Sequence, residues 1–355
     1  MREVGLKFLA FSFLFLALVS SPAFAAKKSK KNKAAESNQA SVRPPDWTFA
    51  KPADYPESRY MTASGSSQFQ KSADSDALSN LAAIFSQKVS SNALAKRNLR
   101  QDSEESALKE FAYEQSVGTR VDESELIGVE IKERFFDGKK YYSLAVMDKV
   151  EAVKLYKGAI EAGNDEIQRL ESFSQDDKIS IDRFANLFLA QKIAEENLRR
   201  LDRLFVINAD EARSVEAKSP QDLRSKRVSL ARQIPIFVQV SGDQDSMAYS
   251  SIVEALNSFG FRVSQNSGER YSLFADFSIE QKLSADKESW QTFYSLSCSL
   301  DDKKNSAAIW SESVKGRISS FKKEDSLDRA KAAMGTKVKD YICQSFSAFL
   351  LGSKK

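Results

Sequence analysis

The sequence predicts an α+β protein with three parts: a small module in which one helix covers an antiparallel sheet, a helical hairpin, and a second α+β domain. Three observations predict this order. Strand-type alternation surrounds one helical stretch in residues 44–148, helical periodicity replaces it in residues 149–217, and long alternating runs return in residues 233–352. We expect these parts to follow a signal peptide at residues 1–25 and a basic, disordered tail at residues 26–43.

The first residues have the features of an export signal. Arg2 and Lys7 precede an apolar run from Phe8 to Val19, which is too short to span a bilayer. Ala23 and Ala25 are small residues at the two positions that a signal peptidase reads, so we expect cleavage after Ala25; an uncleaved anchor is the alternative. No cysteine near this junction offers a site for lipid attachment. We therefore expect a mature chain in the periplasm, soluble or peripherally associated with the outer membrane.

The net charge of the chain is concentrated in the tail. The whole sequence has a formal net charge of +4, and the tail contains Lys27, Lys28, Lys30, Lys31 and Lys33, so the remaining body is nearly neutral. The tail is expected to make a weak contact with an anionic surface, or else to be a solvated spacer. A neutral body and an export signal argue against nucleic acid as a partner.

The chain of 355 residues contains no histidine, which excludes a Ser-His-Asp triad, a Cys-His pair and the usual zinc sites of exported hydrolases. Asp243 and Asp245 follow a predicted strand, where they would bind a hard cation or, more commonly, cap the next helix. Two serine–lysine pairs have the spacing of penicillin-recognising enzymes but lack the partner motifs of that class: Ser284 with Lys287, and Ser319 with Lys322. We expect no catalytic residue, no metal and no cofactor.

Cys298 and Cys343 are the two cysteines, and in an oxidising compartment they form a possible disulfide. Cys298 alternates with Leu296 and Leu300 on the apolar face of a predicted strand. Cys343 belongs to the final helix, near the margin of its apolar stripe. Two buried free thiols are the alternative.

Prolines at positions 44, 45, 52 and 56 prevent a helix in the lead-in segment, which we expect to be held on a surface by Trp47 and Phe49. A strand at 60–66, N-cap candidates at 72–75 and an amphipathic helix at 75–95 follow. Residues 126–148 predict a β-hairpin with Asp137–Gly138 as its two-residue turn.

Short motifs in this part of the chain resemble those of a known family. They are Pro45-x-Trp47, Tyr60-Met61-Thr62-Ala63-Ser64-Gly65, the helical alanines Ala77, Ala82 and Ala83, and Tyr141-Tyr142-Ser143-Leu144-Ala145-Val146-Met147-Asp148. Residues 44–160 are thereby similar to the LPP-twenty family of bacterial envelope lipoproteins, to which the N-terminal part of a flagellar outer-membrane assembly protein is related. The resemblance implies an envelope-associated module without catalytic residues. A second interpretation of Ser64 to Ser67, as an anion-binding nest, has little support because a single glycine without a following Lys-Ser or Lys-Thr falls short of a P-loop.

Residues 149–217 predict an antiparallel helical hairpin, with Ser180 as a plausible N-cap for its second helix. One apolar stripe contains Val150, Val153, Tyr156 and Ile160. The second is a heptad-like, coiled-coil seam of Phe184, Leu187, Gln191, Ala194, Leu198, Leu201 and Phe205. The hairpin either packs within its own chain or mediates self-association, in which case Gln191 would fix the register.

The last part predicts a strand at 234–240, a helix ending at Phe259, a strand starting at Phe261, three long strands within 272–318, and a helix at 326–351. This order resembles that of periplasmic activators of penicillin-binding proteins. The sequence as a whole favours a non-catalytic envelope protein that acts in binding or in outer-membrane or flagellar-type assembly. The alternative is a periplasmic regulator of a cell-wall synthase, and an enzyme is the least favoured function.

Overall fold

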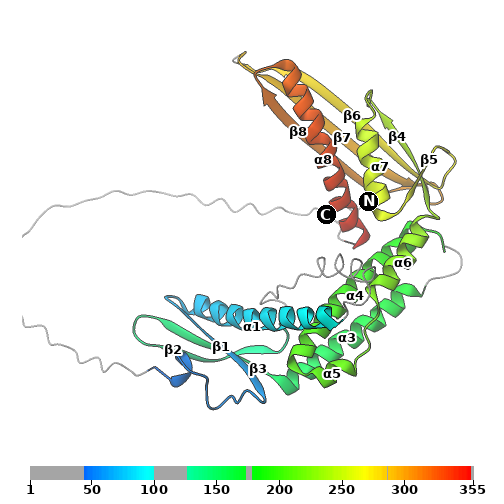
Figure 1. Cartoon of the computed structure of the whole chain (residues 1–355). Coiled ribbons are helices and arrows are strands. Elements are labelled where there is room, and N and C mark those ends of the chain that lie inside the picture. Colours follow the sequence, from blue (N-terminus) through cyan, green and yellow to red (C-terminus); the bar gives the residue numbers. More distant parts are fainter. Residues whose placement is uncertain (1–43, 100–125, 173–177, 286, 353–355) are drawn as a thin grey trace, which may run out of the picture. The chain divides into compact units, whose positions relative to one another are not determined.

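The structure is a computed structural model that describes residues 44–99, 126–172, 178–285 and 287–352 (Figure 1). It contains helices and two sheets, which confirms the predicted α+β class. The expected signal peptide and basic tail lie outside the described residues.

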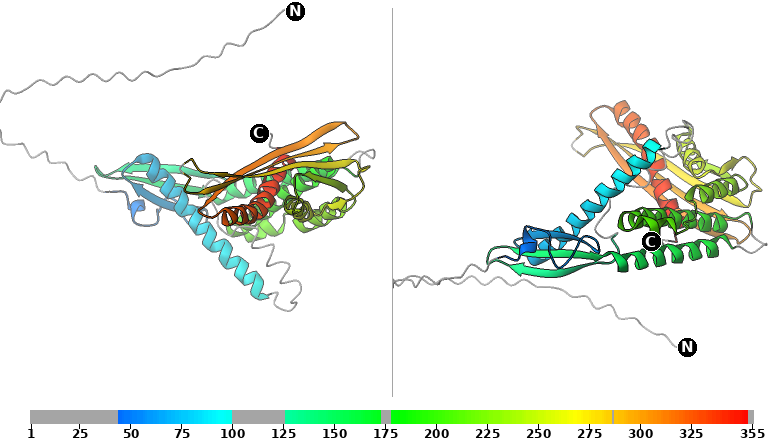
Figure 2. Two further views of the ribbon diagram at one scale, coloured as in Figure 1. Left: turned by 90° about the horizontal axis from the view of Figure 1, so that it is seen from above. Right: turned by 60° about the horizontal axis from the view of Figure 1, so that its bottom comes forward.

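The first module has the predicted order of strand, helix, strand, strand. Its elements are η1 (Asp46–Thr48), β1 (Tyr60–Ser67), α1 (Gln70–Leu99), β2 (Val129–Phe136) and β3 (Tyr141–Asp148). β3 lies between β1 and β2 and is antiparallel to both. α1 covers one face of this sheet (Figures 1 and 2).

The central strand β3 is buried on both faces because different segments cover them. Ala145 faces α1 and belongs to the same apolar cluster as Phe85, a fully buried residue of that helix. Leu144 and Val146 point to the opposite face and pack with Trp47 of η1. Alternating residues of one strand therefore belong to two separate apolar clusters, as the period of a β-strand requires.

One aromatic ring, not two, holds the lead-in segment on the sheet. Trp47 is 6% exposed, as expected, but Phe49 is 67% exposed, so the prediction for Phe49 was wrong. The backbone explains the difference. A short 3₁₀ turn follows Pro45, with the amide of Ala50 donating to the Asp46 carbonyl at 2.8 Å, and this turn redirects the chain directly after Trp47.

Helix α1 begins at Gln70, which is earlier than predicted. The amide of Ala73 donates to the Phe69 carbonyl at 3.0 Å, so helical hydrogen bonding starts almost as soon as β1 ends. The N-cap candidates at 72–75 therefore lie inside the helix, and their proposed capping role was wrong.

The predicted β-hairpin forms, but its connection is longer than two residues. The strands pair as far as Phe136 and Tyr141, which leaves Asp137–Lys140 as the loop. Gly138 has φ +93°, in the left-handed region that favours glycine. The Asp137 carboxylate accepts hydrogen bonds at 2.7 Å from the amides two and three residues further on, which closes the loop.

The helical hairpin consists of α3 (Lys149–Glu171) and α4 (Ile181–Ile207). Ser180 is the N-cap of α4, as predicted, and its hydroxyl accepts a hydrogen bond from the Arg183 amide at 3.1 Å. Val150 is exposed, so its assignment to the apolar stripe of α3 was wrong; Ala152 is buried instead.

A polar contact divides the apolar interface between α3 and α4. Asn197 is fully buried, and its Nδ2 donates to the Ile160 carbonyl at 3.0 Å while its Oδ1 accepts from Arg200 at 3.0 Å. Gly163 packs against it so closely that a Cβ at Gly163 would lie 2.5 Å from the Asn197 Nδ2. The pair fixes the register of the two helices, since a shift of either one would bury an unsatisfied amide.

Two helices after the hairpin were not predicted, α5 (Ala209–Arg213) and α6 (Pro220–Ala231). The start of α6 nevertheless carries a sequence signal. Ser219 is its N-cap, with the hydroxyl accepting from the Asp222 amide at 3.2 Å, and Pro220 occupies the first helical turn.

The C-terminal elements match the predicted ones closely. They are β4 (Pro235–Ser241), α7 (Met247–Phe259), β5 (Arg262–Ser264), β6 (Tyr271–Leu283), β7 (Trp290–Asp302), β8 (Ala307–Ser320) and α8 (Lys323–Leu350). The strand order is β5-β4-β6-β7-β8; β4 is parallel to β5 and β6, and the remaining pairs are antiparallel. α7 and α8 lie on the same side of this sheet (Figure 2).

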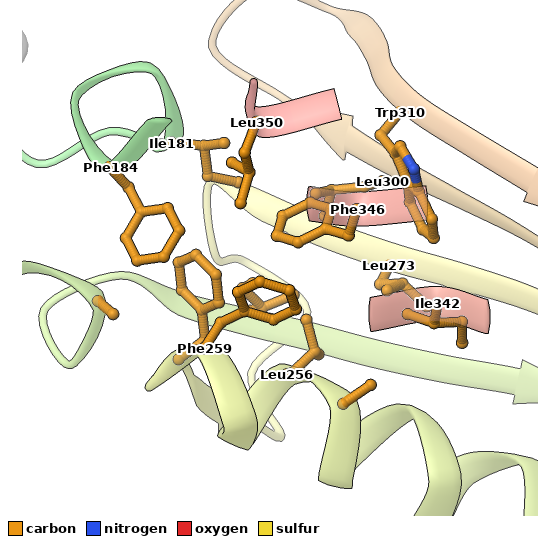
Figure 3. Packing of buried hydrophobic residues seen from close by; sticks show 14 of the residues in the cluster. Ile181, Phe184, Leu256, Phe259, Leu273, Leu300, Trp310, Ile342, Phe346 and Leu350 are labelled. Atoms are coloured by element: carbon orange, nitrogen blue, oxygen red, sulfur yellow. The ribbon is translucent and has the colours of Figure 1, made fainter. Parts of the chain in front are cut away.

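The core beneath α7 and α8 is rich in aromatic rings (Figure 3). The ring of Phe346 in α8 lies 5.1 Å from that of Phe259 and 5.6 Å from that of Trp310, both close to edge-to-face. Phe184 of α4 joins the same core, with its ring 4.5 Å from that of Phe261. The helical hairpin and the second sheet therefore share one apolar cluster.

None of the helices in the described ranges combines the length and the apolar character that crossing a bilayer requires.

Candidate binding groove

The two aspartates considered as a cation site have structural roles. Asp243 caps α7, because its carboxylate accepts hydrogen bonds from the amides of Met247 at 3.0 Å and Tyr249 at 2.8 Å. Asp245 forms an ion pair with Lys331 of α8. Within the described ranges, no group of three or more Cys, Asp or Glu side chains has the arrangement of a metal site.

The serine–lysine pairs lie in exposed connections. Ser284 and Lys287 belong to the loop between β6 and β7, where the Ser284 hydroxyl accepts from the Ser289 amide at 3.0 Å. Ser319 and Lys322 are exposed at the end of β8. Lys287, Ser319 and Lys322 are exposed and Ser284 is half-buried, so these side chains occupy solvated connections.

The Ser64–Ser67 segment is a strand end whose hydrogen-bonding groups are already used. The amide of Ser66 donates to the Asp76 carboxylate at 2.9 Å, and the side-chain amide of Asn80 donates to the Ser64 carbonyl at 2.9 Å. An acidic side chain of α1 thus takes the place that an external anion would occupy in a nest.

Both cysteines are free thiols in the structure, so the possible disulfide is not formed in it. Cys298 is buried on β7, and burial, followed by the nearby Glu312 carboxylate, raises the pKa of its thiol to about 12. Cys343 is half-buried on α8, with its Sγ 3.5 Å from the Ser258 hydroxyl of α7. Cys343 therefore lies at the margin of α8 that faces α7, while Cys298 lies on the sheet. Their pairing stays a prediction.

One charged pair, Asp302 with Arg270, was not predicted from the sequence. Asp302 is 3% exposed and accepts two hydrogen bonds from Arg270, at 2.9 Å from Nε and 2.8 Å from the terminal nitrogen. The hydrogen bonds from Arg270 lower the pKa of the Asp302 carboxyl below its ordinary value. The guanidinium of Arg270 also lies 4.7 Å from the centre of the Tyr271 ring.

A groove of about 760 Å³ lies between the end of α3, the start of α4, and α6. Its apolar lining comes from Ile179, Leu187 and Leu230. Its polar lining consists of Glu171, Lys178, Arg183, Ser225, Lys226, Ser229 and Gln233. The volume lies in the range of small-ligand and peptide sites, and the lining combines apolar contact with a few polar groups.

Some of the charged side chains in this groove form an ion pair, and two do not form one with any described residue. Lys226 forms an ion pair with Glu171 at 2.6 Å. Lys178 and Arg183 have no acidic partner among the residues that the structure describes. Among the described residues, the groove therefore offers two cations without an acidic partner, beside an apolar surface on which Ile179 is 48% exposed.

One buried arginine holds the helices that form the groove. The guanidinium carbon of Arg227 in α6 lies 5.4 Å from the ring centres of both Phe184 and Phe188, which are neighbours on α4. Its Nε donates to the Gln191 side-chain oxygen at 3.0 Å. The sequence analysis considered Gln191 as the residue that fixes the register of a self-association seam. In the structure its side-chain oxygen accepts this hydrogen bond within its own chain.

Comparison with known proteins confirms the resemblance for one segment. Residues 45–148 match the model of a family described as LPP20 lipoprotein. No curated protein matches the chain. The match covers the module formed by η1, β1, α1, β2 and β3, and it indicates an exported, envelope-associated character for that module.

Solved structures with partial similarity come from several bacteria. The secreted protein HP1454 of Helicobacter pylori has a TM-score of 0.46 and 13% identity, covering 79% of this chain and 96% of its own. A minor lipoprotein of Acinetobacter baumannii has a TM-score of 0.25 and 10% identity, covering 34% of this chain and 91% of its own. Lipoprotein GNA1162 of Neisseria meningitidis has a TM-score of 0.22 and 15% identity, covering 31% of this chain and 99% of its own.

Proposed function

We propose that this protein is an exported, non-catalytic binding and assembly factor of the bacterial cell envelope. The envelope assignment is supported by the match of residues 45–148 to a lipoprotein family and by the export features of the first residues. The groove between α3, α4 and α6 is the proposed partner site.

The single observation that carries the binding function is the pairing of apolar and cationic surface in the groove. Lys178 and Arg183 lie at its edge without acidic partners among the described residues, and Leu187 and Leu230 line it. A partner segment with both acidic and apolar side chains complements this lining. Burial of the apolar side chains supplies affinity, and the charges select the partner.

A site-specific cross-linking experiment tests this proposal. A photoreactive amino acid replaces Ser229 in the groove or, as the matched control, Ser311 on exposed strand β8, and the cross-linked peptides are identified by mass spectrometry. We expect one envelope protein to cross-link from Ser229 alone, through a peptide with acidic and apolar residues. The synthetic peptide should compete for the site.

Charge variants make the test specific. Arg183→Glu should lower the affinity of the identified peptide about tenfold or more, whereas Arg224→Glu, an exposed arginine of α6 outside the groove lining, should not. Equal cross-linking from Ser229 and Ser311, or equal peptide affinity of the two charge variants, contradicts the proposal. Stimulation of a purified glycan polymerase would favour the cell-wall regulator instead, and substrate turnover by the pure protein would favour an enzyme.

Two further interactions are proposed from the sequence alone. One is self-association through the helical hairpin, which sedimentation velocity tests, and the other is weak contact of the basic tail with an anionic surface. The seam residues Phe184, Leu187 and Ala194 are buried within the chain, which leaves the outer faces of α3 and α4 as the surfaces for a second copy.

A further inference from the structure

The edge strands of the two sheets differ in how open they are to a further strand. Among the described strands, β1, β2, β5 and β8 lie at sheet edges. Side chains of α1 already bind the Ser64 carbonyl and the Ser66 amide of β1. A register shift between Ile131 and Glu133 interrupts β2, and β5 has only three residues. These features hinder further pairing at three of the edges.

Strand β8 is the long and regular edge (Figure 1). It pairs with β7 without a register shift from Trp310 to Ser320, and its 14 residues include no proline. No other described strand pairs with it. Along its outer side, a row of backbone amides and carbonyls is therefore available to a further strand.

The side chains of β8 that face α8 are arranged symmetrically about Val314. Trp310 lies four residues before Val314, Ile318 lies four residues after it, and all three belong to the apolar cluster or pack against it. In an antiparallel pair of two copies with a two-fold axis at Val314, Trp310 opposes Ile318 of the second copy and Val314 opposes itself. Glu312 opposes Gly316, which carries no side chain. On this face the strand is therefore complementary to itself, with apolar side chains opposite apolar ones.

The opposite face of β8 carries hydroxyl groups on one side of Val314 and cations on the other. Ser311 and Ser313 precede Val314, Lys315 and Arg317 follow it, and these four residues are exposed. The same axis places Lys315 opposite Ser313 and Arg317 opposite Ser311 of the second copy. Each cation thus meets a hydroxyl oxygen that can accept a hydrogen bond, and no two cations are opposed.

The neighbouring registers are disfavoured. Paired residues of an antiparallel ladder point to the same face, so the two-fold axis lies at a residue and not between two residues. An axis at Lys315 would oppose this lysine to itself, and an axis at Gly316 would oppose it to Arg317. An axis at Ser313 would oppose Val314 to an acidic side chain. Of these registers, the axis at Val314 alone avoids both faults.

We propose that β8 pairs with β8 of a second copy of this chain, antiparallel and about a two-fold axis at Val314. The contact joins the two five-stranded sheets into one continuous sheet. Backbone hydrogen bonds along residues 310–318 of both copies and the opposed apolar side chains stabilise it. Because a single strand pair buries little surface, we expect a dimer that dissociates on dilution. The groove is lined by other elements, so this contact does not depend on the proposed partner.

Charge variants test the contact in both directions. Sedimentation velocity of the chain without its expected signal peptide, over a concentration series, measures the dissociation constant of the dimer. Ser313→Glu places a carboxylate opposite Lys315 and should lower this constant about fivefold, because the pair occurs twice in a symmetric dimer. Ser313→Lys opposes two cations and should raise it about fivefold. Ser297→Glu and Ser297→Lys are the matched controls, since Ser297 is exposed on β7 and pairs directly with Ser313, and they should leave the constant unchanged.

A cysteine at the axis tests the register. In a Cys343→Ser background, Val314→Cys should form a disulfide between two copies on air oxidation. Ile318→Cys, four residues from the axis, should not. A photoreactive residue at Ser311 should cross-link to a second copy of this chain and not to the partner of the groove.

Three results would overturn the proposal. They are a monomer at every concentration, equal dissociation constants of Ser313→Glu and Ser313→Lys, and equal disulfide yields of Val314→Cys and Ile318→Cys. A dimer through the helical hairpin gives the second result, because its dissociation constant does not respond to charge at Ser313.

Discussion

Gly65 of β1 lies directly against the backbone of Ala77 in α1. A Cβ at Gly65 would come 2.6 Å from the Ala73 carbonyl oxygen and even closer to the Ala77 nitrogen. Helix and strand approach this closely because Gly65 has no side chain. Its partner on β3 is Ser143, whose hydroxyl donates to Asp74 of α1 at 2.5 Å. The short motif ending in Gly65 thus has a packing role.

Replacement of this glycine tests the packing. Gly65→Ala should lower the free energy of unfolding by about 3 kcal/mol, because the backbone of α1 must move to accept a methyl group. Urea unfolding followed by circular dichroism measures the change. Gly158→Ala is the control: Gly158 is an exposed residue of α3, a Cβ there meets nothing within 4 Å, and the substitution should stabilise the protein slightly. Equal effects of the two variants would contradict the close-packing role.

The Asp302–Arg270 pair predicts a pH dependence of stability. Hydrogen bonds from Arg270 lower the pKa of Asp302 from its ordinary value of 3.8, so the folded state favours the ionised carboxylate. The stabilisation is fully present above that ordinary value and is lost as the pH falls through the lowered pKa. Asp302→Asn should cost about 2 to 3 kcal/mol at pH 7, and the difference from wild type should shrink below pH 4 or so.

Urea unfolding at a series of pH values measures this difference. Asp301→Asn, also at the end of β7, is the matched control: its carboxylate accepts a hydrogen bond from the Ser299 hydroxyl at 2.6 Å, and the substitution should cost about 1 kcal/mol or less. If Asp302→Asn lowers the free energy of unfolding by the same amount at every pH, the ionisation of Asp302 is not coupled to folding.

Arg227 predicts a difference between two conservative substitutions. Arg227→Lys keeps the charge but loses the planar group next to the rings of Phe184 and Phe188 and the hydrogen bond to Gln191, so it should cost about 1 to 2 kcal/mol. Arg224→Lys, on the exposed side of α6, should be neutral. Thermal unfolding compares the two, and a neutral Arg227→Lys would indicate that stacking contributes nothing.

The two thiols should differ in reactivity. Burial raises the pKa of Cys298 to about 12, which suppresses the reactive thiolate, whereas Cys343 is only half-buried. Iodoacetamide labelling of the native protein, read by mass spectrometry, should modify Cys343 first and Cys298 only after denaturation. Cys343→Ser should abolish native labelling. Two cysteines that react only after reduction would instead demonstrate the disulfide.

Local patterns predicted most elements because each one depends on neighbouring residues. The alternation in β6, β7 and β8 and the N-cap at Ser180 are examples. The groove could not be predicted in this way, since Arg183 and Ser229 come from helices that meet only in the folded chain, and α6 was not predicted at all. The burial of Asp302 could not be predicted either, because it depends on Arg270, which belongs to the segment before β6.

At the end of the second sheet near the start of α8, the side chains of Gln281, Thr292 and Ser326 form a hydrogen-bonded polar layer. This layer separates Leu283 and Phe321 from the apolar core cluster, to which neither residue belongs. The effect of a substitution at either residue on stability should therefore add to the effect of a substitution in the core. Evolution can therefore change the aromatic or charged residues at this end of the sheet one at a time, without a compensating substitution inside the domain.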